Sequence, residues 1–430
     1  ATTAGANARS GAAQSVAVGG LDAGGADISV VATSGNITDG GDADTDVVAE
    51  ELRMEAGGDV GEPEGTNNGS METMITQLAG TAEGTNGFFL TDGQSLLIAE
   101  VGPVAVHRVQ ADTTTTVEDS TDNLSDVSTL SNGGAIVLIT TSGDLTIKDG
   151  GDTDTVGIDA DDGGKVRLDS RVGTVDLQST VQSNTGDITI IAAGDVTTAE
   201  NVNIFSGGAG TIDLEASGGS VTFSSSSDQI AGSGHVRVFA ANNVTFGGVL
   251  TTTGDASVTA DAGWIRDADA DGSVDVEADG LRLNAAVGIG QLGGGANAIE
   301  TAVSTVSGRA GAEGINVMES DDLVVGDVAT TVRRVGSDTS VSDVTDAARS
   351  DLVTTDGTNG SIVVQTVAGD IALQDGTAPS NDAAINADGS GRVLVEALGN
   401  GTGITAYADV TSEGGSITVL ADTDVRFLDT

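Results

Sequence analysis

The chain has no cysteine, few aromatic residues and few basic ones. Among its 430 residues there are one Trp, one Tyr, seven Phe and three Pro. The lack of cysteine excludes disulfides and thiol chemistry. Sandwich domains usually bury a Trp or Tyr each, so an aromatic content of 2% argues against a string of them. No run of 18 apolar residues is present, so the sequence predicts no membrane-spanning helix.

The net charge is strongly negative. Sixteen Lys and Arg face 65 Asp and Glu, which gives −49. Only Arg333 and Arg334 are adjacent, and phosphate binding needs basic clusters, so we expect no nucleic-acid partner. Self-repulsion of this size destabilises a fold unless cations screen it. High salt or millimolar extracellular calcium would supply them, which points to the cell surface or the extracellular space. The start at Ala1 without Met is expected of a processed product or of a segment of a longer protein.

The chain is close to a tandem duplication. Residues 16–201 can be laid over residues 244–430, an offset of 228 (244 minus 16). The stretch AIVLITTSGDLTIKDG at 135–150 returns as SIVVQTVAGDIALQDG at 361–376. We therefore expect two repeat units that grow by stacking, as extended surface proteins do. The expected organisation is an N-terminal segment (1–15), a first unit (16–201), connecting turns (202–243) and a second unit (244–430).

A shorter rhythm runs inside each unit. Gly with Asp, Ser or Asn precedes four to six residues that alternate between apolar and polar, the pattern of strands separated by turns. Ile212, Val236, Ala256 and Val274 hold matching positions, 24, 20 and 18 residues apart by their numbers. That spacing predicts an all-β fold, a right-handed parallel β-helix (β-solenoid) whose inward side chains stack from turn to turn. Small residues are expected where the coil is narrow, as at Ala216.

Some segments break the rhythm, and we expect lateral loops or short helical excursions there. They are residues 61–87, 112–132, 288–314 and 336–360. Within them, 71–80 and 298–308 have apolar residues at helical spacing, which predicts one lateral helix in each unit.

Three acidic turns are candidate calcium sites. Asp at alternate positions before a Gly presents the oxygen ligands that calcium prefers, although the bidentate Glu of a complete calcium loop is missing after Gly272. Solvated acidic turns without an ion are the competing interpretation. The candidate ligands are Asp267, Asp269, Asp271 and Asp275 in the second unit, Asp42, Asp44 and Asp46 in the first, and Asp152 and Asp154 in a third cluster.

No catalytic constellation stands out, and we expect no enzyme. His107 and His235 are the only histidines, and they do not occupy corresponding positions. No hydrolase or nucleotide-binding motif lies in a convincing context. The abundant carboxylates lack the Arg, Lys, Tyr and Trp that would hold a sugar, so a polysaccharide-cleaving enzyme is the less favoured interpretation.

The G-G-x-I-x-I-x-A-x-G-D-V patterns and the GAEGINV stretch at 311–317, followed by Glu319 and Asp322-Leu323, resemble the repetitive surface proteins of the filamentous-haemagglutinin type. The resemblance covers nearly the whole chain, and it implies a secreted shaft that mediates adhesion or forms fibres. The resemblance does not extend to that family's N-terminal secretion domain, so it does not predict the export route. Expected partners are further copies stacked head to tail, or a cell-surface receptor. The alternative is a ligand- or carbohydrate-binding adhesin module whose lateral excursions carry recognition.

Overall fold

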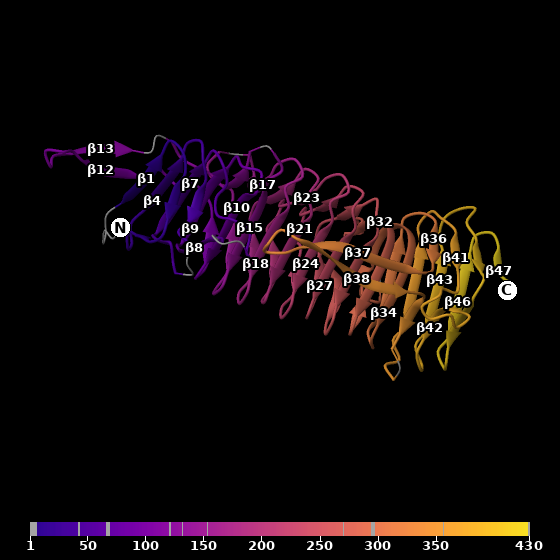
Figure 1. The fold of residues 1–430 in the computed structure, drawn as a ribbon. Helices are drawn as coiled ribbons and strands as arrows, with labels where there is room; N and C mark the ends of the chain where they lie inside the picture. Colours follow the sequence, from indigo (N-terminus) through magenta and orange to yellow (C-terminus); the bar gives the residue numbers. More distant parts are fainter. Residues whose placement is uncertain are drawn as a thin grey trace. The chain divides into compact units, whose positions relative to one another are not determined.

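A computed structural model describes residues 7–41, 44–65, 69–119, 122–130, 132–152, 154–269, 271–293, 297–355 and 357–428. The structure divides into two compact units whose bounds differ from those of the sequence repeats, and these are called the first unit and the second unit. The first holds Ala1–Gly207 with Arg334–Ser342, and the second holds Gly208–Arg333 with Asp343–Thr430. Each unit is built from short strands that follow one another as arrows along its part of the chain (Figure 1).

In the first unit, from β14 (Val127–Thr129) onward, strands pair in parallel with the strand three places later in the chain. This makes three ladders, one on each side of the coil, and three strands per turn. The ladders run through β15 (Ala135–Thr140), β18 (Val166–Ser170) and β21 (Ile188–Ala192); β16 (Leu145–Ile147), β19 (Val175–Leu177) and β22 (Val196–Thr198); and β17 (Val156–Ala160), β20 (Thr180–Ser183) and β23 (Ile204–Ser206). The parallel β-solenoid is therefore confirmed.

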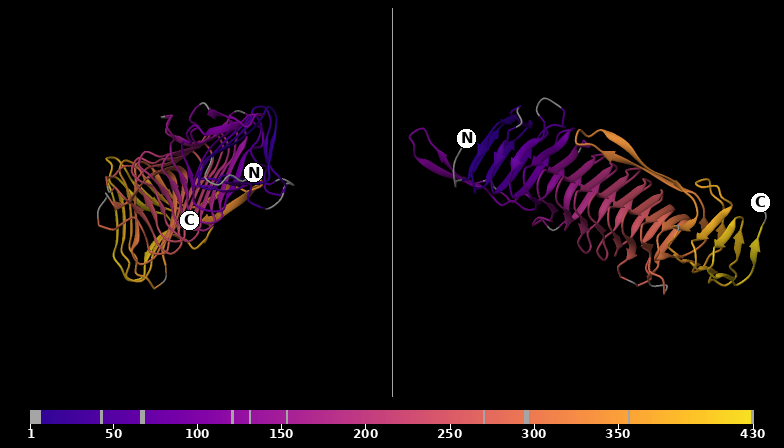
Figure 2. Two further views of the ribbon diagram at one scale, coloured as in Figure 1. Left: turned by 90° about the vertical axis from the view of Figure 1, so that its left-hand side faces the viewer. Right: turned by 90° about the horizontal axis from the view of Figure 1, so that it is seen from below.

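In the second unit, strands also pair in parallel with those of neighbouring turns, although some longer strands take part in two ladders. Most of these strands form one series in the right-hand view of Figure 2. One ladder joins β24 (Ile212–Ala216), β27 (Val236–Ala240), β30 (Ala256–Ala260) and β32 (Val276–Ala285). Ile212, Val236 and Ala256 stack as the spacing predicts. The next member is Leu281, however, and not Val274, which lies in the turn before β32. The turn length changes there, so counting residues from Ala256 selects the wrong partner.

Alternation of side chains explains how these strands fill the coil. In β24, Ile212, Leu214 and Ala216 are buried and Glu215 is only partly exposed. Ala216, Ala240, Ala260 and Ala285 are successive partners and are all buried, so small side chains stack on one another from turn to turn. Ladders of aliphatic side chains thus make up most of the core, and a few buried Phe side chains such as Phe223 and Phe246 lie among them.

The two expected lateral helices are wrong, because no described residue lies in an α-helix. Residues 71–80 contribute β8 (Met71–Met74) and most of β9 (Gln77–Ala82), and residues 299–308 lie in β34 (Ile299–Ala310). These strands pair with neighbouring turns of the coil. Thr and Val are frequent in β34, and β-branched side chains favour strands over helices. Most of the irregular segments are therefore turns of the solenoid.

True lateral excursions are antiparallel hairpins. In the first unit, β12 (Ala105–Val109) pairs with β13 (Thr115–Asp119) and projects away from the coil (Figure 1). β37 (Val328–Val335) and β38 (Val341–Arg349) also form a two-stranded sheet of their own. These two hairpins occupy similar places in the two copies of the sequence.

Buried carboxylates recur at the same places in both units. Asp92 Oδ2 accepts hydrogen bonds from Thr73 Oγ1 (2.7 Å) and from the Ile75 backbone N–H (3.0 Å). In the second unit, Glu319 Oε2 accepts from Thr301 Oγ1 (2.7 Å) and from the Val303 N–H (3.0 Å). Asp92 and Glu319 are fully buried, and burial raises the pKa of Asp92 to about 6 and that of Glu319 to about 7. The duplicated sequence has thus kept its internal polar contacts.

Candidate cation sites

A cluster of three carboxyl groups lies inside the first unit. Candidate ligand oxygens of Asp39, Asp46 and Glu72 all lie within 4.8 Å of one another. Asp39 ends β5 (Ile37–Asp39), Asp46 directly precedes β6 (Val47–Val48), and Glu72 lies in β8, which pairs with β6. The Glu72 N–H donates to Asp46 Oδ2 (3.2 Å) and the Asp46 N–H donates to the Glu72 carbonyl (2.8 Å). The cluster therefore joins consecutive turns of the coil.

The second unit has the corresponding acids on the corresponding elements, but they gather less closely: among the described residues, the groups whose ligand oxygens all lie within 4.8 Å of one another are both in the first unit. Asp267 ends β31 (Trp264–Asp267), Asp275 directly precedes β32, and Glu300 lies in β34, which pairs with β32. The Glu300 N–H donates to Asp275 Oδ2 (3.0 Å), and the Asp275 N–H donates to the Glu300 carbonyl (2.8 Å). The Asp269 N–H donates to Asp267 Oδ1 (2.9 Å), as the Gly41 N–H does to Asp39 Oδ1 (2.9 Å).

Burial among other acids raises the pKa values in both clusters. The pKa of Asp46 rises to about 8, mainly by burial, with Asp39 and Glu72 adding repulsion. The pKa of Asp275 rises to about 9 by burial, with repulsion from Asp267 and Glu300. The pKa of Glu300 rises to about 7 by burial, with repulsion from Asp267 and Asp269. Asp46 Oδ1, Asp267 Oδ2 and both carboxyl oxygens of Glu300 are buried without a hydrogen-bond partner among the described residues. A proton or a cation would relieve this repulsion.

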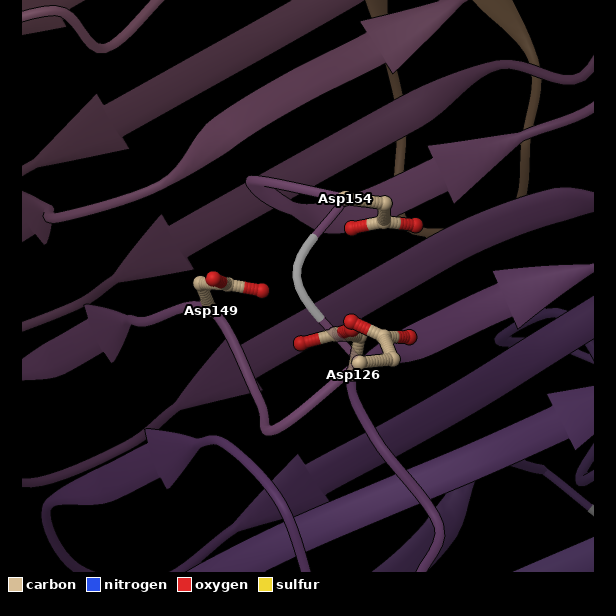
Figure 3. Close-up of side chains that lie close together, drawn as sticks. Asp126, Asp149 and Asp154 are labelled. Carbon is tan, nitrogen blue, oxygen red and sulfur yellow. The ribbon is translucent and has the colours of Figure 1, made fainter.

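A third cluster lies at another turn of the first unit. Oxygens of Asp126, Asp149, Asp152 and Asp154 lie within 4.8 Å of one another. Figure 3 shows Asp126, Asp149 and Asp154 gathered around the turn between β16 and β17. The Gly150 N–H donates to Asp126 Oδ1 (2.9 Å). Burial raises the pKa of Asp126 to about 7, with Asp152, Asp154 and Asp149 adding repulsion.

The second unit keeps only the buried half of this third cluster. Asp351 is fully buried, neither of its carboxyl oxygens has a partner among the described residues, and burial beside Asp375 raises its pKa to about 7. The turn that follows Asp375 carries Ala378, Pro379 and Ser380 in place of the exposed acids. Only the first unit therefore has a full set of four carboxylates here.

The structure brings together some of the candidate ligands that the sequence predicts and leaves others apart. Asp267, Asp275 and Glu300 lie near enough to influence one another's pKa, but their oxygens are not gathered as closely as those of the first-unit clusters. Asp269 is exposed beside Asp267, and Asp271 is exposed and accepts a hydrogen bond from the Ser273 N–H (2.7 Å).

In the first unit, Asp46 joins its buried cluster while Asp44 is exposed, and Asp42 lies outside the described residues. Asp152 and Asp154 are exposed members of the third cluster.

Sequence reasoning missed Glu72, Glu300 and Asp126. Each comes from the neighbouring turn of the coil, about 25 residues away (72 minus 46, 300 minus 275, 152 minus 126). A search for acids one coil period apart would have found them, because adjacent turns stack in register.

Oxygen-only clusters suit hard divalent cations. Calcium takes six to eight oxygen ligands, and three or four carboxylates with nearby carbonyls and water can supply them. With two histidines in the chain and no cysteine, the donor set is unsuited to zinc or copper. Within the part of the chain that the structure describes, no helix has the length and hydropathy needed to cross a membrane.

Comparison with known proteins adds no identity to these observations. No protein-family model matches the chain, and neither a curated protein nor a solved structure matches it.

A terbium experiment tests the second-unit cluster. Trp264 is the only tryptophan, and it shares strand β31 with Asp267. Terbium prefers calcium-type oxygen ligands, so excitation of Trp264 should produce terbium emission from this cluster. We expect Glu300→Gln to remove most of that emission, because the site loses a charged ligand. Glu72→Gln, the matched change in the first unit, should leave the emission nearly unchanged. Equal emission from both variants and the wild type would contradict a site at Glu300.

Proposed function

We propose that this protein is a non-enzymatic structural module, the shaft of an extracellular or cell-surface adhesin or fibre. The observation that carries the proposal is the turn-to-turn stacking: backbone hydrogen bonds and aliphatic ladders link each turn to the next within both units. Such a coil lengthens by adding turns without changing its core, which suits a spacer or filament. The resemblance to filamentous-haemagglutinin-type proteins supports the same role.

Calcium is the proposed partner of the acidic clusters. The two close clusters of the first unit, and the looser group of acids around Asp275 and Glu300, each join neighbouring turns, so a bound cation would hold those turns together. Calcium sites of modest affinity fill where calcium is near millimolar, which favours an extracellular setting. Bound cations would also offset part of the net charge of −49.

Negative-stain electron microscopy tests the shaft. The purified chain should appear as thin elongated particles in about 5 to 10 mM calcium, enough to fill weak extracellular-type sites. Fibres many particles long would support head-to-tail assembly, and their loss in chelator would tie assembly to the cation. Compact round particles in both conditions would contradict the proposed shaft. Release of reducing ends from polysaccharides would contradict the non-enzymatic role.

A further inference from the structure

Four arginines from separate strands lie on one side of the second unit. They are Arg237 in β27, Arg282 in β32, Arg309 in β34 and Arg349 at the end of β38. They are close enough to repel one another: Arg237 lowers the pKa of Arg282, and Arg282 and Arg309 lower that of Arg349. A chain with 16 basic residues against 65 acidic ones concentrates its positive charge here.

Two of these arginines have protein partners. Arg237 forms ion pairs with Asp213 (2.9 Å), Glu215 (3.2 Å) and Asp346 (3.5 Å). Arg282 Nε donates to the Ala347 carbonyl (3.0 Å), which secures β38 to the coil. These contacts account for Arg237 and Arg282 as structural residues.

The other two arginines are not neutralised in this way. Neither Arg309 nor Arg349 forms an ion pair with a residue that the structure describes, and Arg349 Nε is buried without a hydrogen-bond partner there. Burial and repulsion from Arg282 and Arg309 lower the pKa of Arg349 to about 10, and attraction to Asp346 offsets only part of this shift. Two guanidinium groups held close together favour an anion between them.

Arg309 and Arg349 line one cavity of about 330 Å³. Its described lining contains no Asp or Glu, and it includes Asn381 and Asn386. The Asn386 side-chain oxygen accepts from Thr411 Oγ1 (3.1 Å), and that of Asn381 accepts from the Ala383 N–H (3.1 Å). These bonds occupy the acceptor oxygens and leave the amide N–H groups as donors. The cavity thus combines charged and neutral donors in an otherwise acidic protein.

We propose that this cavity binds the oxyanion of a small ligand, a carboxylate or sulfate group such as an acidic sugar carries. Arginine recognises such groups through paired N–H donors, and amides suit the hydroxyl or second oxygen beside them. The volume is near the lower end of ligand pockets, about 300 to 1,000 Å³, and so favours a single small unit over a long stretch of polymer.

The first unit provides an internal comparison. Leu78 of β9 pairs with Leu52, and Val306 of β34 pairs with Leu281, so Leu78 and Val306 hold corresponding positions. Three residues after each of them, the first unit has Thr81 and the second has Arg309. The Gly80 N–H donates to the Asp126 carbonyl, and the Gly308 N–H donates to that of Asp351.

Asp126 and Asp351 therefore correspond, and two residues upstream of them the first unit has Leu124 where the second has Arg349. Both arginines are specific to the second unit. The proposed site is thus an addition to the repeated scaffold and goes beyond the shaft function.

Calorimetric titration of the whole chain tests the site, with glucuronate, sulfate and neutral glucose as probes in low-salt buffer. We expect glucuronate and sulfate to bind and glucose not to bind. The double variant Arg309→Thr and Arg349→Leu installs the first unit's residues, and it should weaken anion binding about tenfold or more. The control variant, Arg108→Thr with Arg426→Leu, removes an equal number of positive charges at exposed positions outside the cavity. It should keep the wild-type affinity.

If the double variant misfolds, Arg309→Thr alone serves, because Arg309 is exposed and its loss leaves the core intact. Circular dichroism checks folding of every variant. Binding of glucose equal to that of glucuronate, no binding of either anion, or equal losses in the cavity variant and the control would overturn the proposal. Binding of both anions with loss only in the cavity variant would establish an oxyanion site, whether or not the sugar ring adds contacts.

Discussion

Without divalent cations, the protein should become less stable as the pH rises from about 5 to 9. Folding raises the pKa of Asp275 from 3.8 to about 9 and that of Asp46 from 3.8 to about 8. Between the unfolded and folded pKa values the folded state holds protons that the unfolded chain has released, so stability is greatest at the acid end and falls with rising pH. Glu300, Asp126 and Asp351, each at about 7, add to the slope.

Calcium should remove most of this loss, because it replaces the proton as the neutralising group. The carboxyls in a cluster titrate together, so the full effect is smaller than a sum of separate shifts and is on the order of 5 kcal/mol. Thermal unfolding at pH 6 and pH 9, each with calcium and with chelator, measures it. The expected result is a large calcium-dependent rise in the unfolding temperature at pH 9 and a small one at pH 6.

The double variant Asp46→Asn and Asp275→Asn is the matched control for this pH dependence. The amides keep the shape of the side chains and remove the two most strongly shifted groups, so the pH slope should flatten and the calcium effect should shrink. Sodium chloride at equal ionic strength separates site binding from general screening of the charge. A wild-type protein whose stability rises from pH 6 to pH 9 in chelator would contradict the account of these clusters.

The second large effect is a loss of stability, which we expect when Gly87→Ala adds a single methyl group. This residue begins β10 (Gly87–Asp92) with φ of +117°, and a Cβ there would overlap the Ala135 carbonyl oxygen and lie 2.5 Å from the Ala135 nitrogen. The contacting atoms belong to the backbone of the next turn, so they cannot rotate away. Gly314, with φ of +81°, meets Ser361 in the same way in the second unit.

We expect Gly87→Ala to destabilise the first unit by about 3 to 5 kcal/mol, from backbone strain and overpacking together. Gly20 is the matched control, because its φ of +127° is similar but a Cβ there would meet nothing within 4 Å. Gly20→Ala should cost about 1 to 2 kcal/mol, from backbone strain alone. Chemical denaturation gives the totals, and amide exchange in β10 and β15 locates the effect. Equal costs for the two variants would show that the close approach to Ala135 is unimportant.

The prediction of a lateral helix in each unit is wrong for a physical reason. Ile299, Val303 and Val306 have helical spacing, yet β34 pairs along its length with strands of the neighbouring turns. Those tertiary hydrogen bonds outweigh a short apolar period, and the Thr and Val content already disfavours a helix. The extension of the ladder to Val274 failed because the turn before β32 is longer than the one before β30, and residue counting assumes equal turns.

The sequence by itself determined the β-solenoid, the aliphatic ladders and the acidic turns, because each follows from a local pattern that repeats along the chain. The tertiary structure decided which acids meet and where positive charge collects. Glu300 reaches Asp275, and Arg309 reaches the cavity beside Arg349, only through the stacking of turns whose lengths differ. Such contacts depend on the register between distant strands, which the pairing of whole turns sets and no single segment specifies.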